Sequence, residues 1–170
     1  MNDIPLDDPI RTATLARPDD PNLRHIGLVG DTYTILLDGQ QTGRRYCLID
    51  MHVPPGGGPP PHRHDFEETF VVLEGVIEAT FRGEKLTVKS GETLHIPANA
   101  PHSFTNASDQ PARLLCTCSP AGQEEFFLLV GVPVSSRTEA PPKLDESGQK
   151  AMMEKAFALA PKYRTELLGP

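Results

Sequence analysis

Three histidines and one glutamate are the residues of this sequence whose types and spacing suit a chemical role. His62 and His64 are separated by one residue, and Glu68 follows shortly after them. His102 lies in a second motif further along the chain. Neutral imidazole and carboxylate are ligands for intermediate and hard divalent ions. Four such ligands leave one or two positions open on a five- or six-coordinate ion, where water or a substrate can bind. The set predicts a mononuclear, catalytic metal site.

The spacing of the first three residues places them on one face of an extended strand. Side chains alternate between faces along a strand, so His62, His64 and Glu68 share a face with Phe70. This arrangement predicts a dry pocket in the interior of a sheet protein. Glu67 has the opposite parity and is expected in solvent, although a bulge in the strand would exchange the two glutamates.

His102 is expected to come from a neighbouring hairpin. Pro97 ends one strand, residues 98–101 form a turn, and His102 opens the next strand. Asn99 is expected in a left-handed conformation, because asparagine tolerates positive φ better than most residues. His95 precedes this turn, and it either faces the cavity as a further base or lies on the outer surface. A lone His-x-His pair is common in proteins and usually has no functional role. The prediction of a metal site therefore depends on the two motifs together.

The elements that must position these residues are short strands rich in β-branched and aromatic side chains. The predicted strands are 32–37, 46–52, 69–73, 76–81, 85–88, 93–96 and 112–118. Turn signals such as Glu74-Gly75 separate them. Strands at this regular pitch without intervening helices favour an antiparallel barrel or sandwich.

The two ends of the chain differ from this middle part. Residues 1–24 are rich in Asp and Pro and are expected to form an arm, residues 25–134 a single β-barrel, and residues 135–170 an extension. Within the extension, Ser147–Ala160 favours a helix that stops at Pro161. Met153 and Phe157 share a face of that helix, which could cover the barrel mouth, mediate a dimer or patch the outer sheet.

Composition excludes several classes of protein. The chain has 170 residues, enough for one domain with a proper core, and its net charge of -7 argues against a nucleic-acid or anionic-membrane surface. No secretory signal is expected, because the first residues are acidic and interrupted by proline, and no apolar run reaches membrane-spanning length. Three cysteines make no disulfide framework. A reduced cytoplasmic protein is expected. Cys116 and Cys118 would share a strand face, as buried small residues or, alternatively, as metal ligands.

The two motifs resemble the signature motifs of the cupin superfamily. The first matches at Gly56, His62, His64, Glu68 and Gly75, and the second at Gly91, Pro97, His102 and Asn106. Asn99 stands where the second motif usually has glycine. The resemblance implies an all-β double-stranded β-helix, a cupin or jelly-roll barrel, here followed by a C-terminal α-helix. It also implies a homodimer, because such barrels usually pair through edge strands or swapped N-terminal arms.

A second resemblance extends beyond the barrel. A Pro-Ala-Gly turn at 120–122, the pair Phe126-Phe127, a Gly-x-Pro at 131–133 and a C-terminal helix resemble single-domain quercetin 2,3-dioxygenase-like cupins. In that family one divalent ion (Fe, Mn, Ni or Co) sits on three His and one Glu. A ligand glutamate takes the proton of the flavonol 3-hydroxyl, and oxygen attack opens the ring with loss of carbon monoxide.

Carried over to this sequence, the resemblance assigns the metal to His62, His64, Glu68 and His102. Glu68 would be both a ligand and the catalytic base for a small phenolic or enolisable substrate. Pocket walls are expected from Phe66, Phe70 and Phe104, with His95 beside them, and Phe126-Phe127 would form a lid or seal the barrel end. Two alternatives stay open: an isomerase, decarboxylase or lyase on the same site, with zinc as a further candidate ion, and a non-catalytic binding cupin.

Overall fold

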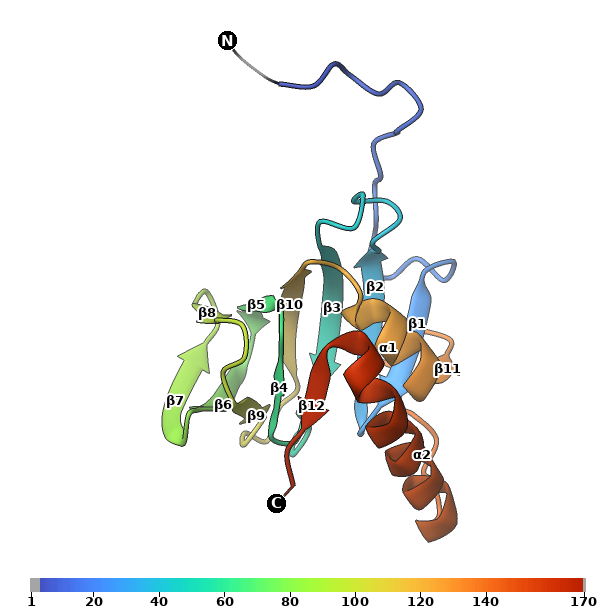
Figure 1. The fold of residues 1–170 in the computed structure, drawn as a ribbon. Helices are drawn as coiled ribbons and strands as arrows, with labels where there is room; N and C mark the ends of the chain where they lie inside the picture. The colour runs from blue at the N-terminus through green and yellow to red at the C-terminus, as the bar shows by residue number, and fades with distance from the viewer. Residues whose placement is uncertain (1–3, 170) are drawn as a thin grey trace.

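Two antiparallel sheets face each other in the computed structural model, which describes residues 4–169 (Figure 1). The seven-stranded sheet has the order β11-β1-β2-β3-β10-β5-β8, and the five-stranded sheet has the order β12-β4-β9-β6-β7. Their inner faces enclose the core. This architecture confirms the all-β jelly-roll barrel with a C-terminal helix that the sequence predicts.

The elements follow one another as a series of short strands with helices near the C-terminal end. They are β1 (Arg24–Leu28), β2 (Asp31–Leu37), β3 (Cys47–Val53), β4 (His62–His64), β5 (Glu67–Glu74), β6 (Val76–Phe81), β7 (Glu84–Lys89), β8 (Thr93–Ile96), β9 (His102–Thr105), β10 (Ala112–Ser119), α1 (Gln123–Val130), β11 (Val132–Val134), α2 (Glu146–Leu159), the 3-10 helix η1 (Ala160–Tyr163) and β12 (Thr165–Leu167). The predicted strands agree with β2, β3, β5, β6, β7, β8 and β10 to within two residues at each end.

The core lies between the sheets because the central strands alternate buried and more exposed side chains. In β10, Leu114, Cys116 and Cys118 are fully buried, while the residues between them are partly exposed. The neighbouring strand β5 alternates in the same way and buries Phe70 and Val72. Each large apolar side chain buried in this manner contributes about 1.5–3 kcal/mol to folding. This period-two burial fixes which residues face the interior.

The N-terminal arm leaves the barrel, whereas the C-terminal extension returns to it. Residues 4–23 form no regular element. Figure 1 shows the first part of this segment running away from the two sheets, whereas Asp19 and Asp20 lie against the barrel and contact Arg137 and His25. The first three residues of the predicted arm lie outside the described residues. After α2 the chain enters β12, which pairs with β4 in the five-stranded sheet. The extension therefore completes the sheet that carries three of the predicted metal ligands, His62, His64 and His102.

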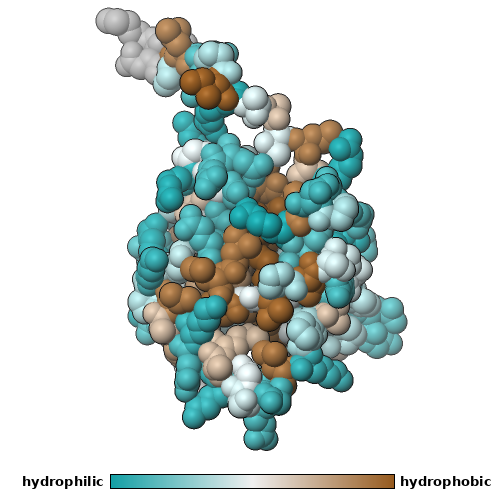
Figure 2. All heavy atoms as spheres, turned by 90° about the vertical axis from the view of Figure 1, so that its right-hand side faces the viewer, coloured by the Kyte–Doolittle hydropathy of each residue, from teal (hydrophilic) through white to brown (hydrophobic). Residues whose placement is uncertain are grey.

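Helix α2 begins where the sequence predicts, with Asp145 as its N-cap accepting a hydrogen bond from the Gly148 amide. The helix buries Ala156, while Met153 and Phe157 stay 39% and 50% exposed. Figure 2 shows apolar side chains gathered on the face of the molecule that carries this part of the chain. Neither α2 nor another helix in the described range is long and apolar enough to cross a membrane.

Candidate metal centre

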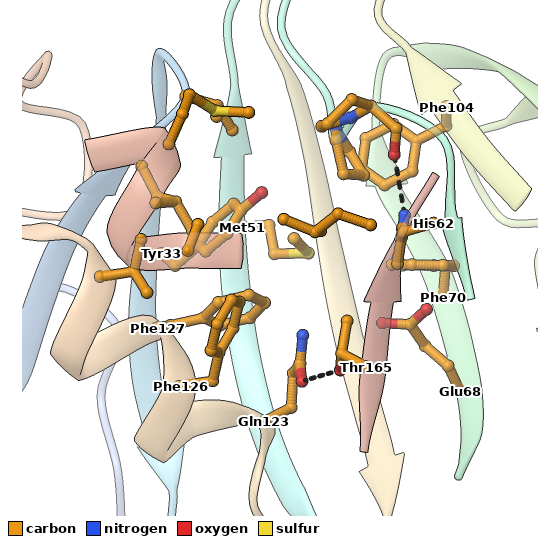
Figure 3. A pocket seen from close by; sticks show the side chains of 18 residues that line it. Tyr33, Met51, His62, Glu68, Phe70, Phe104, Gln123, Phe126, Phe127 and Thr165 are labelled. Carbon is orange, nitrogen blue, oxygen red and sulfur yellow. Dashed lines mark hydrogen bonds between the residues drawn. The ribbon is translucent and has the colours of Figure 1, made fainter. Parts of the chain in front are cut away.

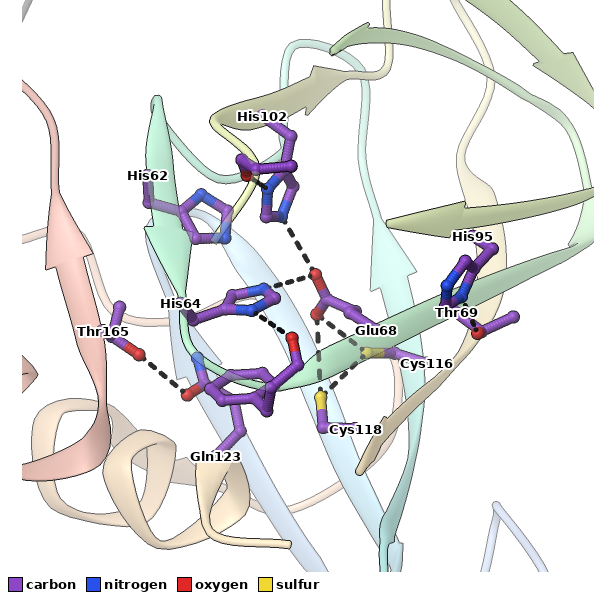
Figure 4. Close-up of polar contacts among 12 residues, drawn as sticks. His62, His64, Glu68, Thr69, His95, His102, Cys116, Cys118, Gln123 and Thr165 are labelled. Carbon is purple, nitrogen blue, oxygen red and sulfur yellow. Dashed lines mark hydrogen bonds and ion pairs between the residues drawn. The ribbon is translucent and has the colours of Figure 1, made fainter. Parts of the chain in front are cut away.

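The four predicted ligands meet between the two sheets. His62 and His64 project from β4, His102 from β9 and Glu68 from β5 (Figure 4). Their ligand atoms all lie within 4.8 Å of one another, and all four side chains are buried. Residues from distant parts of the sequence thus form one compact cluster of three imidazoles and a carboxylate.

Strand register explains how the cluster assembles. His62 lies directly opposite His102 in the pairing of β4 with β9, and their ring centroids are 4.2 Å apart. His64 follows two residues later on the same face of β4. Asn99, in the turn before His102, has a φ of 68°, the left-handed conformation predicted from its residue type.

The path of the chain to Glu68 differs from the sequence prediction. A single strand is expected to carry both histidines and the glutamate, but the chain leaves β4 after His64 and enters β5 in the other sheet. The bend at Asp65 and Phe66 makes this crossing. Glu68 therefore faces the histidines from across the barrel, while the Glu67 side chain is 52% exposed as expected.

Each of the three imidazoles is oriented by a backbone carbonyl two residues away. The Nδ1 atoms contact the carbonyl oxygens at 2.9 Å for His62 and Pro60, 3.0 Å for His64 and Phe66, and 2.9 Å for His102 and Ala100. Because a carbonyl oxygen can only accept, each Nδ1 carries a proton and donates it. This hydrogen bond fixes the tautomer and leaves each Nε2 with its lone pair free to bind a metal.

The donor set fits a divalent transition ion. Nε2 of His64 and Nε2 of His102 each lie 3.0 Å from Oε2 of Glu68. A nitrogen lone pair this close to a carboxylate oxygen is repulsive unless a proton or a metal cation lies between them. Burial removes water as an alternative partner and increases the cost of leaving the site without a cation. Metal binding at such a site therefore displaces protons.

The charges of the cluster suit metal binding at neutral pH. Burial alone would raise the pKa of Glu68, but its contacts with His102 and His64 outweigh burial and lower the pKa well below the usual range. Burial lowers the pKa of His62 to about 4, and the neighbouring His102 acts in the same direction. At neutral pH, Glu68 is therefore an anion and His62 a neutral imidazole.

These shifts predict that the metal-free protein loses stability in acid. Unfolded His62, with a pKa of 6.5, takes up a proton that the folded residue, with its pKa of about 4, does not. Unfolded Glu68, with a pKa of 4.5, takes up its proton at a higher pH than the folded residue. Both effects have the same sign, so the free energy of unfolding decreases as pH falls. The His62 part develops between pH 6.5 and about 4 and amounts to about 3 kcal/mol at most.

Urea unfolding of the metal-free protein at several pH values in this window measures that dependence. The variant His62→Gln lacks the titrating imidazole and is the matched control, because it should lose less stability over the same range. Equal pH dependence of the two proteins would contradict the assignment.

Two buried thiols border the other side of Glu68. Oε1 of Glu68 lies 3.2 Å from Sγ of Cys116 and 3.7 Å from Sγ of Cys118, and the two sulfurs are 3.7 Å apart. A hydrogen bond with Cys118 lowers the pKa of Cys116, but burial and the negative charge of Glu68 outweigh it and raise the pKa to about 12. Cys116 is therefore a protonated thiol at neutral pH.

A largely apolar cavity of about 80 Å³ opens beside the cluster, where it contacts His62 and Glu68 (Figure 3). Phe70 and Phe104 line it as predicted, and their rings meet edge to face at 5.3 Å. Phe66 instead stacks flat on the ring of His64, at 3.8 Å between centroids, and so supports a ligand rather than the cavity wall.

The expectation that His95 belongs to this cavity is wrong. His95 lies on the outer face of β8, and its side chain is 54% exposed. Its Nε2 is 3.0 Å from Glu67, and its Nδ1 is 3.1 Å from Thr69. The next residue, Ile96, is buried in the interior. Alternation along β8 therefore turns His95 outward.

The cavity also has walls that the sequence patterns do not predict. Its remaining lining comes partly from Tyr33 and Met51, and partly from Gln123 of α1 and Thr165 of β12. The hydroxyl of Thr165 donates to Oε1 of Gln123 at 3.4 Å. Phe126-Phe127 of α1 line the cavity too, in agreement with the predicted seal. No motif marks Gln123 or Thr165, because their role depends on how the C-terminal segment docks.

The glycine-rich loop that leads to His62 is held by buried polar groups. Asn106 donates from Nδ2 to the carbonyl of Val53 at 2.9 Å, and its backbone pairs with Gly56 and Gly57. Gly58 has a φ of 126°, and a Cβ there would meet the carbonyl oxygen of Phe104 at 2.2 Å, so only glycine fits. The Asn and Gly positions of the two motifs thus fix the approach of the chain to the cluster.

Comparisons with known proteins agree with this geometry. Residues 49–118 match the Cupin domain family. An uncharacterised protein of Methanocaldococcus jannaschii is 34% identical over 84 residues, which cover 49% of this chain and 67% of that protein. The region that matches the family, residues 49–118, contains both motifs and all four residues of the cluster.

Two further similarities extend over more of the chain. Quercetin 2,3-dioxygenase of Bacillus subtilis is 29% identical over 128 residues, which cover 75% of this chain. This chain spans 37% of the length of that relative. The solved structure of the polyketide cyclase RemF from Streptomyces resistomycificus is 23% identical, with a TM-score of 0.54, and the match covers 85% of this chain and 97% of RemF. At that identity the structural match supports the fold alone.

Proposed function

This chain belongs to the cupin superfamily, and from that premise we propose that it is a metal-dependent dioxygenase of the quercetinase-like type. The observation that carries the proposal is the buried cluster of three oriented imidazoles and one carboxylate beside an apolar cavity. The similarity to quercetin 2,3-dioxygenase supports the oxidative chemistry. His62, His64, Glu68 and His102 would hold one divalent ion, and the nitrogen and oxygen donors favour Fe, Mn, Co, Ni or Zn over softer ions.

A divalent ion bound here would stabilise the ionised form of a substrate hydroxyl and promote its reaction with oxygen. The chain's own residues supply the rest. Glu68 is the group that accepts the hydroxyl proton, because its carboxylate is anionic and lines the cavity. Phe70 and Phe104 exclude water and provide flat apolar contacts for a planar substrate.

The size of the cavity favours a small substrate. A volume of about 80 Å³ accommodates several water molecules but is below the roughly 300 Å³ of usual small-molecule pockets. A compound with one ring or an open-chain enolisable carbonyl therefore fits with less rearrangement than a three-ring flavonol. Helix α2, whose Met153 and Ala156 line the cavity, is the wall that a larger substrate would displace.

Oxygen consumption by the metal-loaded protein tests the proposal. Protein freed of metal and reloaded separately with Fe(II), Mn(II), Ni(II) or Co(II) is expected to take up oxygen in the presence of a β-diketone or a simple phenol, more slowly with a flavonol. Turnover that persists without oxygen would instead identify an isomerase, decarboxylase or lyase. Substrate binding with no product under either condition would identify a binding protein.

A further inference from the structure

The two oxygens of Glu68 have different surroundings, and this difference has no part in the function proposed above. Oε2 faces the imidazoles of His64 and His102 at 3.0 Å. Oε1 faces the other way, toward Sγ of Cys116 at 3.2 Å and Sγ of Cys118 at 3.7 Å (Figure 4). The carboxylate is thus held between a nitrogen side and a sulfur side.

The sulfur side is built by the pairing of β10 with β5. Cys118 lies opposite Glu68 in this pairing, and Cys116 lies opposite Phe70. Both thiols point to the barrel interior and are fully buried. The Cys116 thiol donates to Oε1 at 3.2 Å, whereas the Cys118 thiol is the more distant donor at 3.7 Å. A hydrogen bond to an ionised acceptor is stronger than a hydrogen bond between neutral groups.

We propose that Cys116 is a positioning residue of the metal centre. Its S–H donates to Oε1 of Glu68, keeps that oxygen turned away from the imidazoles, and leaves Oε2 as the single oxygen that binds the ion. Without this donor, Oε1 is free to rotate toward the ion and occupy the position that a substrate would take. The inference rests on the metal site of the proposed function, but it does not depend on which reaction the site catalyses.

Cobalt(II) bound to the protein reports the coordination directly, because its visible bands weaken and shift as the coordination number rises. Two variants remove the donor: Cys116→Ala, which leaves a small space, and Cys116→Val, which fills the position of the thiol with a somewhat larger apolar side chain. Cys116→Ser retains a donor. Cys47→Ala is the matched control, because Cys47 is equally buried and lies opposite Cys118, but its thiol does not contact Glu68. Circular dichroism establishes that each variant folds.

The expected result is a weaker, shifted cobalt spectrum in Cys116→Ala and Cys116→Val, with an affinity for Co(II) reduced by about 10-fold or more. Cys116→Ser and Cys47→Ala should match the unmodified protein. If the cobalt spectra of all four variants match that of the unmodified protein, the inference is overturned while the proposed metal site stands. A sulfur-to-cobalt charge-transfer band lost in Cys116→Ala would also overturn it, because the thiolate would then be a ligand.

Two remaining outcomes concern the site and the fold. Failure of the unmodified protein to bind Co(II) would overturn the proposed metal centre together with this inference. Unfolding of both donor-free variants, when Cys116→Ser folds, would assign the thiol a role in stability and would likewise overturn the inference.

Discussion

Replacing His102 with alanine is expected to abolish stoichiometric metal binding while the barrel stays folded. The substitution removes one of four ligand atoms that lie within 4.8 Å of one another. Loss of an outer partner of a ligand usually costs 10- to 100-fold in metal affinity, and loss of the ligand itself should exceed that. The fold should persist because the apolar core of the barrel does not include His102. Metal analysis of the purified protein and chelator competition measure the change.

A matched control for this experiment is His95→Ala. His95 is exposed on the outer face of β8, so its removal should leave the metal content unchanged. His62→Ala should reproduce the loss seen with His102→Ala, because the two residues are register partners. Full metal content in both cluster variants, with loss in His95→Ala, would show that the ion is bound elsewhere.

The sequence alone was sufficient to name the four residues of the cluster, because fixed motif spacings and strand alternation are local properties. His62, His64, Glu68 and His102 could be named even though the chain crosses from one sheet to the other before Glu68, since the crossing does not change which side of each strand is inside. His95 shows the limit of this reasoning. The sequence does not indicate which face of β8 carries the His95 side chain. In the structure, β8 pairs with β5 and Ile96 is buried, so His95 faces outward.

Some residues that line the cavity could not be predicted from the sequence, and the reason is different. Gln123 and Thr165 reach the cavity through α1 and the three-residue strand β12, and such short elements are stabilised by packing more than by their own propensity. Phe126-Phe127 resembles a strand in composition, yet it lies in α1, where Phe127 packs on Tyr33 at 5.0 Å. Tertiary contacts therefore decide the part of the site that selects the substrate.

Glu68→Gln is expected to eliminate most of the turnover of the metal-loaded enzyme. Glutamine has nearly the same shape, but its amide is neutral and cannot accept the substrate proton, so the variant lacks the general base. Loss of such a group usually lowers the rate by about 10²–10⁴-fold. The amide also weakens metal binding, so the rate must be measured at saturating metal and expressed per bound ion.

The neighbouring Glu67 supplies the control that separates base chemistry from a general effect of charge. Its side chain is 52% exposed and pairs with His95 outside the barrel, so Glu67→Gln should retain full turnover. A rate per bound ion that is unchanged in Glu68→Gln would show that another group takes the proton. Among the residues lining the cavity, the hydroxyl of Tyr33 is no substitute, because burial first and the nearby Asp31 second raise its pKa well above the usual value. Glu68 is therefore the carboxylate whose charge and position both suit the step, and this pair of variants tests that assignment directly.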